Sequence, residues 1–70
     1  MTVREYVLAH KDEYTHGLVM IGQKKNNKTF SRAIVQEDMD CFIIGSKKRI
    51  GTYKFNTDKV KYKYTLLIIN

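Results

Sequence analysis

The chain of 70 residues contains no proline, one cysteine, and no apolar run near the length of a membrane span. The absence of proline favours a compact sheet with short turns. A single cysteine excludes an internal disulfide, and no Cys/His group has zinc-site spacing, so we expect no metal and no cofactor. A chain this short buries only about 60% of its unfolded surface. Without either kind of cross-link, self-association is the expected source of extra stability, which predicts a homo-oligomer.

The cellular compartment is inferred from the same absences. A lone cysteine fits a reducing compartment. The N-terminus lacks the apolar segment of a signal peptide, so the sequence predicts a cytoplasmic protein without a membrane partner.

Positive charge is concentrated in the second half of the chain. The formal net charge is +6, and residues 1–41 contain six bases and six acids. Residues 42–70 contain seven bases and a single acid, Asp58. Charge segregated in this way favours an acidic partner, although a small protein also needs net charge to remain dissolved.

The C-terminal stretch, residues 58–70, alternates strictly between two kinds of side chain. One face of a strand here is apolar or aromatic and comprises Val60, Tyr62, Tyr64, Leu66 and Ile68. The opposite face begins with Lys59, Lys61 and Lys63 and continues with Thr65, Leu67 and Ile69. We therefore expect the rings to point into the core and the lysines toward water. The second half is expected to be buried on both faces or covered by a partner.

The first half of the chain predicts a helix and a hairpin. Thr2 and Glu5 have capping-box spacing, apolar residues follow at helical intervals, and Gly17 provides a stop, so a helix is expected over residues 3–14. Residues 18–35 read as two strands around Asn26-Asn27, because asparagine tolerates positive φ. That turn places Gln23 opposite Phe30, Ile21 opposite Arg32 and Val19 opposite Ile34.

Shorter segments follow that hairpin. Residues 36–40 read as a turn or a single helical turn, residues 41–44 as a short buried strand, and residues 50–55 as a further strand. The sequence thus predicts one α+β domain over residues 1–70. A single N-terminal helix would pack on an antiparallel sheet of four or five strands.

The last hairpin has a predicted register. A turn centred on Thr57-Asp58 pairs Phe55 with Val60, Tyr53 with Tyr62, and Gly51 with Tyr64, so that aromatics meet and a ring covers the glycine. The same register places Lys54 across from Lys61, and like charges opposite one another are destabilising.

Two basic segments are candidates for binding an anion. Residues 45–49 read as a polar turn, and residues 45–52 resemble a phosphate loop without its Walker spacing. The exposed backbone N–H groups of this glycine turn would make an anion nest beside three cations. The lysine face of the last strand would contact phosphates, unless it only protects a solvated edge against aggregation. The predicted anion-binding residues are Lys47, Lys48, Arg49, Lys54, Lys61 and Lys63. Tyr53 and Tyr62 are the candidates for stacking on a base.

Catalysis has little basis in the sequence. Cys41 with His10 or His16 as base is one arrangement, but the apolar residues after Cys41 indicate a small buried hydrophobe. The acids at residues 37–40 lack the glycine and distal glutamate of an EF-hand. We therefore expect a non-enzymatic protein with no catalytic residue.

The opening Thr2-Val3-Arg4-Glu5-Tyr6 segment and the Lys-, Asn-, Ile- and Tyr-rich composition resemble small proteins of phages and mobile elements of AT-rich bacteria. That resemblance implies a protein acting by binding inside a bacterial host cell. The leading hypothesis is binding of an anionic partner, nucleic acid or nucleotide. The alternative is an inhibitor of a host defence system, such as an anti-CRISPR protein. It would contact a host protein or a second copy through an exposed face at Leu67 and Ile69, for example by strand addition at a free sheet edge.

Overall fold

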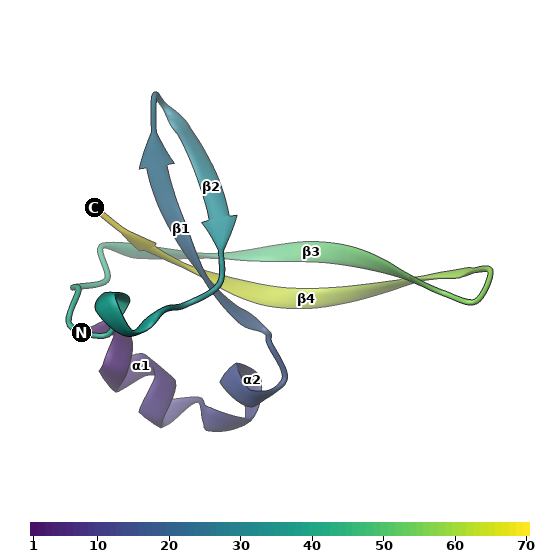
Figure 1. Ribbon diagram of the computed structural model, residues 1–70, viewed down its shortest axis with the longest axis horizontal. Coiled ribbons are helices and arrows are strands. Elements are labelled where there is room, and N and C mark those ends of the chain that lie inside the picture. The colour runs from purple at the N-terminus through teal and green to yellow at the C-terminus, as the bar shows by residue number, and fades with distance from the viewer.

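The computed structural model describes all residues 1–70 and contains two short helices, a 3-10 turn and four strands (Figure 1). In chain order these are α1 (Val3–Ala9), α2 (Lys11–Thr15), β1 (Val19–Lys25), β2 (Lys28–Arg32), η1 (Gln36–Asp38), β3 (Gly45–Phe55) and β4 (Asp58–Ile69). The α+β class predicted from the sequence is confirmed.

The four strands form a single mixed sheet in the order β2-β1-β4-β3. Two antiparallel hairpins, β1–β2 and β3–β4, are joined by parallel pairing of β1 with β4. Figure 1 shows the hairpins crossing, with the helices gathered beside the crossing point. The prediction of a wholly antiparallel sheet is therefore wrong. The segment between β2 and β3 leads the chain back across the sheet, so that β4 pairs with β1 in the parallel direction.

The N-terminal helix begins as predicted but is interrupted. Thr2 caps α1, and its side chain and that of Glu5 make both hydrogen bonds of the capping box. These bonds lower the pKa of Glu5 below its ordinary value. His10, at φ −130° and ψ 49°, separates α1 from α2. Two short helices therefore stand in place of the single helix predicted over residues 3–14. Gly17 adopts φ 71°, which confirms the left-handed stop.

The β1–β2 hairpin has the predicted turn and register. Asn26 and Asn27 have φ values of 53° and 64°. Gln23 pairs with Phe30 and Ile21 with Arg32. β2 ends at Arg32, so the predicted pairing of Val19 with Ile34 does not form.

The core lies on the sheet face that α1 covers. It consists of Val3, Val7, Val19, Ile21, Leu67 and Ile69. Partly buried side chains from the β2–β3 connection, Cys41 among them, pack against it. Residues 41–44 do not form the buried strand that was predicted: Phe42 makes one bridge with Thr2, and Phe42 and Ile44 are exposed. The predicted burial of residues 65–69 on both faces is confirmed, since all five are buried.

The predicted turn at residues 36–40 is present as η1, and an ion pair anchors it. The buried carboxylate of Asp38 accepts hydrogen bonds from Arg32 Nη1 and Nη2, at 2.7 and 2.8 Å, and from the Val35 backbone at 2.9 Å. The bonds from Arg32 hold the pKa of Asp38 below its ordinary value, against the opposing effect of burial. The acidic segment is thus attached to β2 rather than to the C-terminal lysines.

Candidate anion-binding surface

The outer part of the β3–β4 hairpin extends beyond the rest of the molecule. Parallel pairing between β1 and β4 involves only residues 65–69 of β4, so residues 58–63 pair with β3 alone. We call residues 50–63 the arm. Figure 1 shows it projecting away from the helices and the other hairpin. Most of its side chains are exposed, which makes it the most accessible part of the positively charged half of the chain.

The turn of the arm lies one residue earlier than predicted. Phe55 pairs with Asp58, so the turn residues are Asn56 and Thr57, and Asn56 adopts φ 57°. Each predicted pair is consequently displaced: Tyr53 faces Val60 and Gly51 faces Tyr62. The shift is two positions along β4, an even number, so every side chain stays on the face predicted for it.

One face of the hairpin contains five ammonium groups. Direct cross-strand partners share a face. The pairs on this face are Lys48 with Thr65, Ile50 with Lys63, Thr52 with Lys61, and Lys54 with Lys59. We call the set the lysine face, and its cations are Lys48, Lys54, Lys59, Lys61 and Lys63. The like-charged cross-strand pair predicted between Lys54 and Lys61 forms instead between Lys54 and Lys59.

None of these lysines forms an ion pair. The two ion pairs of the chain join Arg4 to Asp40 and Arg32 to Asp38, so two acids of the residue 36–40 segment already have partners elsewhere. The lysine face therefore keeps its charge available to an external anion.

The opposite face of the arm is aromatic. Tyr62 lies next to both Tyr53 and Tyr64, with ring centroids 5.8 and 5.9 Å apart. Because α1 packs on the other side of the sheet, these rings lie outside the core, and Tyr53 is 52% exposed. The expectation that the rings point into the core is therefore wrong, whereas the predicted exposure of Lys59, Lys61 and Lys63 to water is confirmed. Two further predicted cations, Lys47 and Arg49, belong to this aromatic face.

The predicted anion nest is absent. Residues 45–52 are a regular part of β3, paired residue by residue with β4, and neither Gly45 nor Gly51 has a positive φ. Gly51 has a different role, because its missing side chain leaves room for the ring of Tyr62 to lie directly over the backbone. Lys47, Lys48 and Arg49 consequently offer an anion only their side chains.

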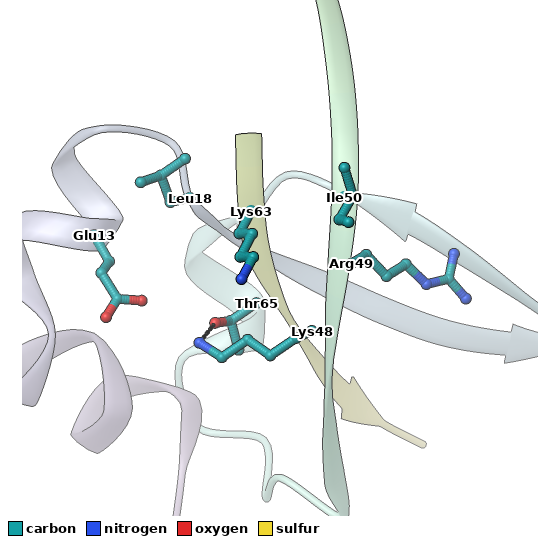
Figure 2. Close-up of a pocket in the computed structure, with 7 residues that line it drawn as sticks. All are labelled: Glu13, Leu18, Lys48, Arg49, Ile50, Lys63 and Thr65. Carbon is teal, nitrogen blue, oxygen red and sulfur yellow. Dashed lines mark hydrogen bonds between the residues drawn. The ribbon is translucent and has the colours of Figure 1, made fainter. Parts of the chain in front are cut away.

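A cavity lies where the arm joins the sheet. Its volume is about 450 Å³, and it is lined by Glu13, Leu18, Lys48, Arg49, Ile50, Lys63 and Thr65. Figure 2 shows Lys48 and Lys63 directed into it, whereas the guanidinium of Arg49 points away. Lys48 Nζ donates to Thr65 Oγ1 at 2.6 Å. The sequence did not single out Glu13 or Thr65, because nothing local in it brings α2 beside β4.

The remaining predicted sites lie elsewhere. Leu67 and Ile69, predicted as an exposed protein interface, are 0% and 3% exposed, so they face the core and present no such surface. Cys41 Sγ donates to the Glu37 carbonyl and has no hydrogen bond with either histidine. His10 stacks on Tyr6. No three His, Cys, Asp or Glu side chains are grouped as metal ligands would be.

Neither helix has the length or apolar character needed to cross a lipid bilayer. No protein-family model, curated protein or solved structure matches the chain. Self-association, expected from the small size, stays a prediction.

Proposed function

We propose that the chain is a non-enzymatic nucleic-acid-binding protein whose arm contacts the phosphate backbone through the lysine face. One observation supports this most directly: five lysines share one face of the β3–β4 hairpin, four of them on the projecting arm, and none has an acidic partner within the chain. Lysines placed in this way neutralise phosphates and release the counterions condensed on them.

The shape of the arm also supports a nucleic acid as the partner. The major groove of duplex DNA admits a two-stranded β-ribbon. A ribbon in that position would direct ammonium groups at the phosphates along the groove. Because the tyrosines lie on the other face, lysine contacts alone would bind with little sequence preference. On a single strand, Tyr53 and Tyr62 would in addition offer rings for stacking bases.

The test compares two charge-reversal variants. Lys59→Glu/Lys61→Glu reverses two charges on the arm. Lys25→Glu/Lys28→Glu reverses the charges of two exposed lysines that pair with each other at the tip of the β1–β2 hairpin. Both variants replace two lysines by two glutamates, so their net charges are identical. We expect the arm variant to lose binding to a labelled duplex and to a labelled single strand at physiological salt. The β1–β2 variant is expected to bind as the unmodified chain does.

Retained affinity in the arm variant with an intact circular dichroism spectrum would refute the proposal. Equal losses in both variants would also refute it, because they would show that net charge rather than the arm determines binding.

The alternative, a host-defence inhibitor that binds through Leu67 and Ile69, loses its proposed surface, since both side chains are buried.

A further inference from the structure

We propose that the cavity at the root of the arm binds a terminal phosphate, the doubly charged phosphomonoester of a mononucleotide or of a 5′-phosphorylated strand. The proposal deepens the function proposed above and rests on it for the choice of a nucleotide phosphate as ligand. The cavity is distinct from the outer part of the lysine face: Lys54, Lys59 and Lys61 do not line it.

The first argument is the number of charges. Lys48 and Lys63 enter the cavity from adjacent strands, and neither has an ion-pair partner. A phosphomonoester has a charge of about −1.5 to −2 near pH 7, whereas an internal phosphodiester has one negative charge. Two ammonium groups therefore match the terminal phosphate better.

The second argument is that one of the two cations is held in place. Thr65 is buried at 3% exposure, and its hydroxyl accepts a hydrogen bond of 2.6 Å from Lys48 Nζ. An ammonium group has three donors, so two remain for phosphate oxygens. Fixing a flexible lysine before the ligand arrives reduces the ordering entropy lost on binding.

The third argument concerns access. The cavity is bounded by Glu13 and Leu18 on one side and by β3 on the other (Figure 2). The cavity is half open to solvent between these walls, so the phosphate at a chain end can reach both ammonium groups. Glu13 is the one carboxylate in the lining, and it would repel the phosphate. Its charge therefore lowers the affinity of the site without neutralising either lysine through an ion pair.

The experiment uses the whole chain and three probes. These are a single-stranded oligonucleotide with a 5′-phosphate, the same oligonucleotide with a 5′-hydroxyl, and adenosine 5′-monophosphate. Affinities come from anisotropy and, for the mononucleotide, from amide chemical shifts in two-dimensional NMR. We expect the 5′-phosphorylated strand to bind roughly tenfold more tightly than its hydroxyl twin, the effect of one additional charge-assisted contact. The mononucleotide is expected to shift the amides of Leu18, Lys48 and Thr65.

Three variants test the assignment to these residues. Lys48→Gln/Lys63→Gln should remove the preference for the 5′-phosphate, and Lys24→Gln/Lys25→Gln, on the other hairpin, should retain it. Glu13→Gln should strengthen mononucleotide binding several-fold. Unchanged NMR spectra outside the cavity would show that each variant remains folded.

Each outcome decides between the two proposals. Equal affinity for the two strands, without mononucleotide binding, would overturn the cavity proposal and leave binding by the arm intact. Mononucleotide binding without binding of either strand or of the labelled duplex would support the cavity and refute the arm. A preference for the 5′-phosphate that survives in Lys48→Gln/Lys63→Gln would overturn the cavity proposal. Failure of all three probes would overturn the cavity proposal, and failure of the labelled duplex as well would refute both proposals.

Discussion

The dependence of binding on salt is the most quantitative prediction of this structure. The steepest slope is reached when each of the five ammonium groups on the lysine face neutralises a separate phosphate, and log affinity then falls with log salt at a slope of about −4.5 for duplex DNA. Raising the salt from about 50 to about 200 mM then weakens binding roughly 500-fold. A single strand has a smaller slope of about −3.5, and the same change weakens binding roughly 130-fold.

Removing two of the five charges tests this arithmetic. In Lys59→Gln/Lys61→Gln three ammonium groups remain on the face, so the duplex slope should fall to about −2.7 and the loss to roughly 40-fold. The assay is fluorescence anisotropy of a labelled duplex at several salt concentrations, with Lys24→Gln/Lys25→Gln as the control of equal net charge. A slope near zero, or one that is identical in the two variants, would show that the lysine face does not contact phosphates.

Three further predictions concern stability. Lys54→Glu replaces the like-charged pair with Lys59 by an opposite-charged one, so it should stabilise the fold by about 0.2–1 kcal/mol in urea denaturation while weakening nucleic-acid binding; a loss of stability would contradict this. The lowered pKa of Asp38 stabilises the fold above its unfolded pKa of about 3.9, and this contribution disappears as pH falls through the lower folded pKa. Asp38→Asn should therefore cost about 1.5–3 kcal/mol at pH 7 and progressively less in acid, and a pH-independent difference would refute the assignment. Gly22→Ala should destabilise the fold by about 1–3 kcal/mol, because the added Cβ would lie 2.7 Å from both Leu66 Cγ and Ile68 Cδ1. Gly45→Ala is the control and should be tolerated, because the nearest atoms to its added Cβ are 4.0 Å away.

Features set by neighbouring residues were predictable from the sequence. The capping box of Thr2 and Glu5, the positive φ of Gly17 and the two-asparagine turn at residues 26–27 each depend on a few consecutive positions. The register of β1 and β2 follows directly from that turn. In the second hairpin Asn56 had the same preference for positive φ, but the alignment of aromatic rings favoured a turn one residue later.

The side of the sheet covered by α1 was not predictable from alternation alone. Near its end β4 is apolar on both faces, with Leu66 and Ile68 on one and Leu67 and Ile69 on the other. The pattern predicts two buried surfaces but does not say which one meets the helix. The choice depends on contacts with Val3 and Val7, more than fifty positions away, so the inward placement of the tyrosines was wrong. Four of the five cations of the lysine face, Lys54, Lys59, Lys61 and Lys63, were predicted to lie together, because alternation fixes which side chains share a face. Lys48 was placed in a turn instead.

The parallel seam between β1 and β4 has a kinetic consequence. Val19 pairs with Thr65 and Gln23 with Ile69, so each contact closes a separation of 46 positions (65 − 19 and 69 − 23). Each hairpin can form from contacts between residues close in the sequence. Pairing of β1 with β4 additionally costs the entropy of closing a loop of that length. The rate-limiting step of folding should accordingly be the docking of two preformed ribbons, and substitutions at Ile21 or Leu67 should slow refolding more than substitutions at either turn.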